Sequence, residues 1–148
     1  MIDQKIFDTK TNFHGAKGLI FIDGKILVYR RDGRTSSFPF CIDLPGGGRE
    51  PNESPFETFR REVKEEFSVT LESHDIVYSK KYASVIDSSM EAYFLVAKPS
   101  NVRRQDVVPS YEVPKPMFMD IEEYLTTTDA IPRYVEKVKE YMKSITVM

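Results

Sequence analysis

The sequence predicts an α/β fold of the α+β type, in which helices cover a β-sheet. Two apolar segments rich in β-branched residues flank the dipeptide Asp23-Gly24. An amphipathic helix with clear start signals is expected from Pro55 to Phe67, and further strand-like segments and a second amphipathic helix follow it. Because strands and helices are mixed along the chain, helices packed on a sheet would bury all of these apolar faces.

Length and composition are those of an ordinary globular domain. The 148 residues suit one compact domain, which we expect to span residues 1–148. The formal net charge is −2, and the basic residues are scattered. We therefore expect no nucleic acid polymer as partner, because such a surface needs a clustered basic excess. An anionic small molecule stays compatible with this charge, because bound cations supply positive charge locally.

Three further features indicate a cytoplasmic protein. No segment is long and apolar enough to span a bilayer, so we expect no membrane association. Cys41 is the only cysteine, which excludes an intramolecular disulfide and favours a reducing compartment. The N-terminal segment MIDQKIFDTKTNF lacks the apolar centre of a signal peptide.

The first part of the chain predicts a hairpin followed by loops. The run GLIFIDGKILVYRR reads as two strands joined at Asp23-Gly24, a dipeptide suited to a tight turn with positive φ. The stretch from Asp32 to Asp43 has the composition of a loop. We expect Leu44 to Gly48, the run LPGGG, to be an irregular turn, because Pro followed by three Gly suits no regular element.

The helix from Pro55 to Phe67 is the clearest element of the sequence. Ser54 is the expected N-cap, Pro55 the first helical residue, and Glu57 completes a Ser-x-x-Glu capping box. Apolar residues then recur at helical spacing and should form the buried stripe, namely Phe56, Phe59, Val63 and Phe67.

Strands and helices alternate after this helix. Strands are expected at Asp75 to Ala83 and Met90 to Ala97, the second with the dense apolar pattern of a central strand. The polar, proline-containing stretch from Asn101 to Pro116 should be a loop. A short helix capped by Asp120 follows. The last helix should run from about Pro132 to Lys143, with Val135, Val138 and Met142 facing inward.

Three acidic residues of the Pro55–Phe67 helix are candidates to bind a metal. At 100° per residue, Glu62, Glu65 and Glu66 fall in one sector of roughly 100° beside the apolar stripe. Carboxylates at this spacing lie about 5–6 Å apart and repel one another, which is costly at the edge of a buried face. A hard divalent cation compensates for this repulsion, and Mg²⁺ takes oxygen ligands while keeping positions for water and phosphates.

The glycine-rich run before the helix suits a phosphate ligand. Glycines let backbone groups approach a ligand closely, and the free N–H groups of a helix N-terminus favour anions. Taken alone, the acidic segment is typical of a solvated helix face, and three glycines are typical of a simple turn. The joint spacing of the two features favours a site that cleaves a diphosphate.

That spacing resembles the signature of the Nudix hydrolases, G-x5-E-x7-R-E-U-x-E-E-x-G-U, where U is bulky and aliphatic. Gly47 is followed by five residues and Glu53, and then by seven residues and the run Arg61 to Val69. One specified position departs, since Ser68 stands where the family has Gly. That position lies just past the helix end, where a left-handed residue closes the last turn, so the departure bears on helix termination and leaves the metal ligands in place.

The resemblance implies a fold and a set of roles. The fold would be an α/β/α sandwich with a mixed β-sheet. Glu62, Glu65, Glu66 and the Gly46 carbonyl would bind Mg²⁺, with Mn²⁺ as an alternative, and Arg61 would orient Glu53. The general base varies within the family. It would be Glu62 or an acid of a later segment, for which we favour Glu112, as the base or as an extra metal ligand, over Asp106 and Glu91. The resulting catalytic set is Glu62, Glu65, Arg61 and Glu112.

Residues outside this motif are candidates to bind the substrate. Gly47 and Gly48 would approach its phosphates, and Arg30 or Arg31 could grip a phosphate, although strand alternation turns one of the two to solvent. His14 and His74 lack metal-ligand spacing, and Cys41 lacks a neighbouring histidine to activate it. Aromatic side chains that could stack on a base are Phe38, Phe40, Tyr82, Tyr93, Tyr111 and Phe118.

The expected function is that of a pyrophosphohydrolase for a nucleoside di- or triphosphate derivative. The short chain resembles MutT-like nucleoside triphosphatases, and a nucleotide-sugar hydrolase is the close rival. A Nudix-fold module that senses a nucleotide without cleaving it is the alternative from another class, and an isomerase that uses Cys41 with a glutamate is a third. The resemblance also makes a homodimer an expectation.

Overall fold

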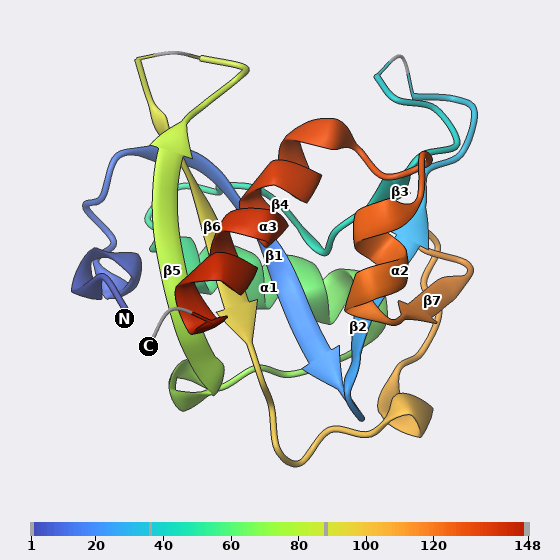
Figure 1. Ribbon diagram of the computed structural model, residues 1–148. Coiled ribbons are helices and arrows are strands. Elements are labelled where there is room, and N and C mark those ends of the chain that lie inside the picture. Colours follow the sequence, from blue (N-terminus) through green and yellow to red (C-terminus); the bar gives the residue numbers. More distant parts are fainter. Residues whose placement is uncertain (1, 36, 88, 147–148) are drawn as a thin grey trace.

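The computed structural model describes residues 2–35, 37–87 and 89–146, and its centre is a mixed, seven-stranded sheet (Figure 1). The main strand order is β3-β2-β1-β6-β5, with β4 paired to β1 and β7 paired to β2. The strands are β1 Phe13–Ile22, β2 Lys25–Arg30, β3 Ile42–Asp43, β4 Gly46–Gly48, β5 Ile76–Ala83, β6 Glu91–Ala97 and β7 Pro116–Met119. The α-helices are α1 Pro55–Phe67, α2 Ile121–Thr126 and α3 Pro132–Thr146.

The predicted hairpin is confirmed. Strands β1 and β2 pair antiparallel, with Phe21 opposite Ile26, and only Asp23 and Gly24 separate them. Both turn residues have positive φ, 51° and 81°, as a two-residue turn matched to the strand twist requires.

The two strands expected after α1 are also confirmed, and they make the sheet mixed. Strand β6 pairs parallel with β1 and antiparallel with β5, so it lies inside the sheet as its apolar pattern predicted. A parallel pair requires a crossover connection, and the chain between β1 and β6, which includes α1 and β5, provides it.

The helices cover both faces of the sheet, which confirms the three-layer sandwich. In Figure 1, α2 and α3 lie in front of the sheet and α1 lies behind it. The four apolar residues predicted for the α1 stripe are buried in one core, together with Leu27 and Leu95 of the sheet. The opposite core contains Tyr124 of α2 and Val138 of α3. Among the described residues, no helix has the length and apolar character needed to cross a membrane.

The expectation of an irregular turn at Leu44–Gly48 is wrong for its second half. Gly46–Gly48 forms β4, antiparallel to β1, with Gly47 opposite Ala16. The missing side chains permit this pairing, because a Cβ at Gly46, whose φ is 124°, would lie 2.2 Å from the Ala16 carbonyl oxygen. The predicted loops likewise end in short strands, β3 and β7, which pair with β2.

Helix α1 begins and ends as predicted. The Ser54 hydroxyl accepts from the Glu57 N–H at 3.1 Å, and the Glu57 carboxylate accepts from the Ser54 N–H at 2.8 Å. Ser68 ends the helix in the left-handed region, with φ 61° and ψ 26°. The residue that departs from the Nudix signature therefore adopts the backbone conformation for which glycine is favoured.

Two details of the C-terminal helices differ from expectation. The Asp120 side chain makes no capping bond to α2 but accepts from Lys25 Nζ at 2.9 Å, because it lies beside β2 in the folded chain. In α3, Val138 faces inward as predicted, while Val135 and Met142 are only partly buried and Tyr134 and Tyr141 take the central positions.

Replacing Ser68 with glycine should stabilise the protein by about 1 kcal/mol, because glycine adopts positive φ without steric cost. Urea unfolding of the wild type and Ser68→Gly would measure the difference. Ser68→Ala is the matched control, since it removes the exposed hydroxyl but keeps the unfavourable φ, and it should not stabilise. A glycine variant less stable than the wild type would contradict the expectation.

Candidate active site

Three carboxylates from two parts of the chain meet beside β4. Glu62 and Glu66 lie one turn apart on α1, and Glu112 comes from the loop before β7. One oxygen atom of each lies within 4.8 Å of the others. We call Glu62, Glu66 and Glu112 the acidic trio. The structure thus brings together two of the predicted metal ligands and the acid that was favoured as a further ligand or base.

The burial of the acidic trio fits a divalent cation. Glu66 is only 4% exposed, so its charge is poorly solvated. Carboxylates this close repel one another, and their ionised forms require a compensating positive charge. A set of oxygen donors of this kind suits Mg²⁺ or Mn²⁺.

The pKa values of Glu62 and Glu66 are raised by this burial and by the repulsion between carboxylates. Burial raises the pKa of Glu66 to about 8, although Lys17 and the Gly46 N–H oppose the shift. Burial also raises the pKa of Glu62, where the charge of Arg61 opposes the shift and those of Glu65 and Glu112 add to it. Because a bound cation favours ionised carboxylates, it would reverse both shifts.

Strand β4 positions the helical glutamates. The Gly46 N–H donates to Glu66 Oε1 at 3.1 Å. At Gly47, an added Cβ would lie 2.3 Å from Glu62 Oε2, so only glycine leaves this carboxylate its place. The glycines therefore let β4 lie close to the acidic trio. Gly46 contacts the trio through its N–H, which donates to Glu66. Its carbonyl as a metal ligand stays a prediction.

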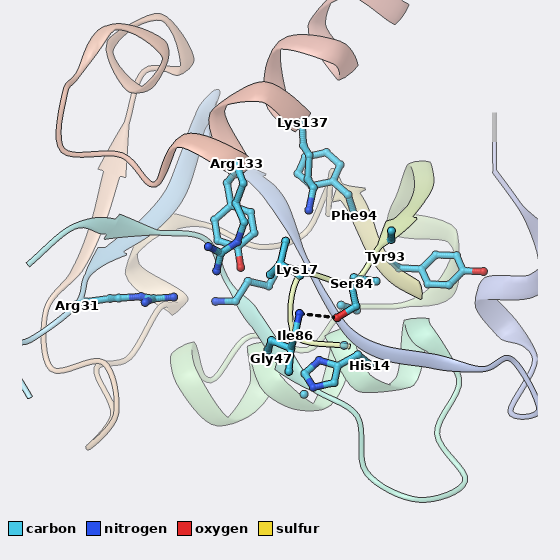
Figure 2. A pocket seen from close by; sticks show the side chains of 17 residues that line it. His14, Lys17, Arg31, Gly47, Ser84, Ile86, Tyr93, Phe94, Arg133 and Lys137 are labelled. Atoms are coloured by element: carbon cyan, nitrogen blue, oxygen red, sulfur yellow. Dashed lines mark hydrogen bonds between the residues drawn. The ribbon is translucent and has the colours of Figure 1, made fainter. Parts of the chain in front are cut away.

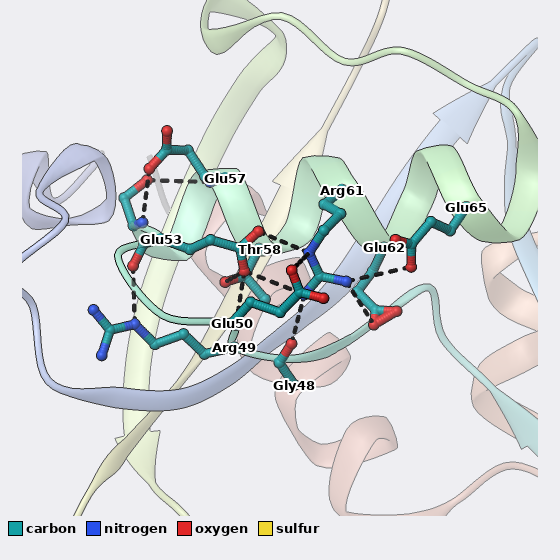
Figure 3. A network of polar contacts seen from close by, with 10 residues as sticks. Gly48, Arg49, Glu50, Glu53, Glu57, Thr58, Arg61, Glu62 and Glu65 are labelled. Carbon is teal, nitrogen blue, oxygen red and sulfur yellow. Dashed lines mark hydrogen bonds and ion pairs between the residues drawn. The ribbon is translucent and has the colours of Figure 1, made fainter.

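Arg61 braces this arrangement from the side (Figure 3). Its Nε donates to Glu53 Oε2 at 2.7 Å, and an Nη donates to Glu53 Oε1 at 3.2 Å. The same side chain donates to the Gly48 carbonyl at 2.8 Å, so it ties α1 to both Glu53 and β4. The contact between Arg61 and Glu53 is the one the sequence predicted.

The other acidic candidates lie outside the acidic trio. The Glu65 side chain is 47% exposed and accepts from Arg61 at 3.3 Å, so a water-mediated role for it stays a prediction. Asp106 accepts from the Arg103 N–H, and Glu91 borders a different surface depression with Lys5 and Asp8. Of the acids in later segments that were weighed as a base, Glu112 is the one that the fold brings to the site.

A buried ionic cluster next to the acidic trio was not anticipated. Asp43 accepts hydrogen bonds at 3.0 Å from Lys17 Nζ, the Tyr29 hydroxyl and Arg31 Nε. Although burial alone would raise the pKa of Asp43, Lys17 and Arg31 hold it below its usual value. Lys17, a lysine in a largely apolar strand, is the sequence signal that points to this cluster.

Strand alternation predicts that one of Arg30 and Arg31 points to solvent, and their partners agree with this prediction. Arg31 joins the buried Asp43, whereas Arg30 is exposed and donates to Asp129 at 3.1 Å. Both border a cavity of about 670 Å³ together with Gly46 and Glu112, and a smaller cavity adjoins it. A phosphate-binding role for either arginine stays a prediction.

The smaller cavity, of about 200 Å³, lies between β1 and α3 (Figure 2). Lys17, Arg31 and Gly47 border both cavities, so the two are parts of one cleft. Gly48 borders the smaller cavity, as does His14, which the sequence suggested was incidental.

The aromatic candidates differ widely in accessibility. Tyr111 is 90% exposed and borders the larger cavity, so it is free to stack on a ligand. Tyr93 is buried in the core, and Tyr82 donates to Glu140 on α3. Cys41 packs against the α3 side of the core and borders neither cavity itself, although its carbonyl accepts from the Arg31 N–H at 2.8 Å.

Comparisons with known proteins show the family and the fold. A NUDIX domain model matches residues 12–140. The fold is similar to that of a MutT protein from Methanosarcina mazei Go1 (TM-score 0.70, 23% identity, 91% of this chain and 96% of the other). It is also similar to a C. elegans Ap4A hydrolase (TM-score 0.66, 17% identity, 90% and 99%).

A bifunctional NMN adenylyltransferase/ADP ribose pyrophosphatase from Francisella tularensis, complexed with AMP and a Mn ion, has a similar fold over part of its length (TM-score 0.58, 16% identity, 81% of this chain and 36% of the other). A search of curated proteins gives no match.

The metal-free protein should lose stability as the pH rises toward 8. The pKa of Glu66 in the folded state, about 8, lies above its unperturbed value of 4.5. The contribution of the neutral carboxyl is therefore complete below about pH 4.5 and is lost as the pH approaches 8. Urea unfolding in a chelator at pH 6, 7 and 8 should show this loss, and Glu66→Gln should reduce it. Equal pH dependence in both proteins would contradict the assignment.

Gly47→Ala should weaken Mn²⁺ or Mg²⁺ binding by roughly 10- to 100-fold, because the new Cβ displaces the Glu62 carboxylate. Gly48→Ala is the matched control, since a Cβ there meets nothing within 4 Å. Calorimetric titration of the three proteins with each metal would measure the affinities. If the two alanine variants bound metal equally well, β4 would not position Glu62.

Proposed function

The chain belongs to the Nudix hydrolase family, and from this premise we propose that it is a Mg²⁺-dependent pyrophosphohydrolase of nucleoside diphosphate derivatives. The single observation that carries the proposal is the acidic trio, in which Glu66 is buried against the Gly46 N–H and Glu62 lies against Gly47. This combination of poorly solvated carboxylates and a side-chain-free strand suits a cation that bridges the protein and a phosphate.

Each residue of the site has a proposed role in hydrolysis. Glu62 and Glu66 would hold the cation, and Gly47 and Gly48 would leave room for the diphosphate beside them. A bound Mg²⁺ would neutralise phosphate oxygens and lower the pKa of the attacking water. Arg61 would keep α1 aligned with β4 through Glu53 and the Gly48 carbonyl.

Glu112 is the proposed base. It is the exposed member of the acidic trio, so water reaches it more readily than it reaches Glu66. In the reaction, a water oxygen attacks one phosphorus atom, the bridging P–O bond breaks, and Glu112 accepts a proton from the water. The leaving phosphate departs with the bridging oxygen. Lys17 and Arg31, which line both cavities, are positioned to offset the negative charge of the phosphates.

The proposed substrate is a MutT-like nucleoside triphosphate or a nucleotide sugar. The names of similar structures support a nucleotide diphosphate linkage, since they include a MutT protein and an Ap4A hydrolase. The AMP and Mn ion in the Francisella tularensis complex support the same class of ligand and metal.

Glu66→Gln should lower turnover at least about 100-fold, because it removes a cation ligand from the least solvated position. Release of phosphate or pyrophosphate from a panel of nucleoside triphosphates, nucleotide sugars and dinucleoside polyphosphates, with Mg²⁺ or Mn²⁺, would measure it. Glu136→Gln, on the exposed side of α3, is the control and should keep full activity.

Turnover that survives both Glu66→Gln and a chelator would contradict the proposed mechanism. Tight binding of a nucleotide by the wild type without any turnover across the panel would favour a non-catalytic sensing module instead.

A further inference from the structure

The smaller cavity is bordered by basic side chains from separate elements (Figure 2). Lys17 comes from β1, Arg31 follows β2, and Arg133 and Lys137 come from α3. His14 of β1 also borders it, and no acidic side chain does so among the residues the structure describes. The whole chain has a net charge of −2, so this concentration of positive charge is a local feature.

The two cations of α3 differ from the other basic residues of the cleft. Lys17 and Arg31 share the buried carboxylate of Asp43. Within residues 2–35, 37–87 and 89–146, neither Arg133 nor Lys137 has a carboxylate within ion-pair distance. On the same helix, Lys139 does have one, since it pairs with Glu136 at 3.7 Å. Arg133 and Lys137 are thus cations that border the cavity without a carboxylate partner among the described residues, whereas the exposed Lys143 of α3, which also has none, lies outside it.

The Tyr134 ring lies against both of these cations, and Lys137 Nζ also lies 4.7 Å from the centre of the Tyr82 ring. The Arg133 guanidinium lies 4.9 Å from the centre of the Tyr134 ring, and Lys137 Nζ lies 5.4 Å from it. Tyr134 is buried, so its ring is a fixed platform for both side chains. Burial and the charge of Arg133 lower the pKa of Lys137.

The backbone of α3 adds to this positive potential. Arg133 lies in the first turn of the helix, where the macrodipole is positive and a cation is unfavourable. That turn contains no acidic residue to offset it. An anionic ligand in the cavity would relieve both the repulsion between the two cations and their conflict with the helix end.

The cavity is close enough to the acidic trio for one substrate to occupy both. Gly47 borders the cavity and also contacts Glu62. A divalent cation bound by the acidic trio would offset the charge of a diphosphate held there, and Lys17 and Arg31 are partly offset by Asp43. Arg133 and Lys137 thus remain for another anionic group of the same molecule.

We propose that Arg133 and Lys137 bind a second phosphate group of the substrate, outside the diphosphate that is cleaved. This inference rests on the proposed function and narrows it, because the preferred substrates become nucleotide derivatives with an additional phosphate on the ribose. Val85 and Ile86, which also border the cavity, provide the apolar surface against which the sugar would lie.

The test compares ligands that differ only in this phosphate. Binding of adenosine 5′-monophosphate, adenosine 2′,5′-bisphosphate and adenosine 3′,5′-bisphosphate would be measured by calorimetry with Mg²⁺ present. The wild type should bind at least one bisphosphate about tenfold more tightly than the monophosphate, because two charge-assisted contacts are gained. Which bisphosphate is preferred identifies the ribose position.

Three double variants assign the preference to the two side chains. Arg133→Gln with Lys137→Gln should abolish it. Arg133→Lys with Lys137→Arg should retain it, because the charges are kept. Lys139→Gln with Lys143→Gln removes the same charge from the exposed side of α3 and should leave the preference intact. Urea unfolding of each variant would show that it is folded.

Equal affinity of the wild type for all three nucleotides would overturn the proposal, as would a preference that survives in Arg133→Gln with Lys137→Gln. A separate assay distinguishes failure of this proposal from failure of the proposed function. It measures the hydrolysis of coenzyme A and of dephospho-coenzyme A, which differ by one ribose phosphate. A binding preference without hydrolysis of either compound, or of any nucleotide in the panel above, would refute the pyrophosphohydrolase and leave the phosphate site standing.

Discussion

The repulsion among three carboxylates that share one small space governs the design of this protein. Glu66 is buried, Glu62 lies one helical turn away, and Glu112 arrives from a distant loop. Such a group is unfavourable in water and more so in a protein interior, where charges are poorly solvated. A divalent cation turns this repulsion into attraction, and the neighbouring elements are arranged to keep the carboxylates close while leaving room for it.

Two rigid supports keep the carboxylates in this position. Strand β4 lies directly against α1 because glycine has no side chain, and Gly46 donates its N–H to Glu66. Arg61 joins α1 to Glu53 and to the end of β4, so the helix cannot slide along the strand without breaking several charge-assisted bonds. Stability and metal binding are therefore coupled in this region, since the same contacts serve both.

The cleft has opposite charge on its two sides. The acidic trio lies on the α1 side, while the cations of α3 lie on the other, and the buried cluster around Asp43 joins them. A ligand with phosphates and a sugar matches this polarity, because the cation on the acidic side and the basic residues on the other side both attract phosphates. Helix α1 supplies Glu62 and Glu66 to the acidic trio, and α3 supplies Arg133 and Lys137 to the smaller cavity.

The sequence alone determined those features that depend on near neighbours. The limits of α1, its capping box, the left-handed Ser68 and the hairpin turn all follow from local sequence, because their bonds join residues a few positions apart. The pairing of Glu62 with Glu66 follows from helical periodicity in the same way. Only the tertiary structure decided which distant groups join them. It brought Glu112 to the acidic trio, made Gly46–Gly48 a strand, placed Asp43 between Lys17 and Arg31, and turned Arg133 and Lys137 toward the cleft. These contacts depend on how strands pair and helices pack, and local propensity does not specify such long-range choices.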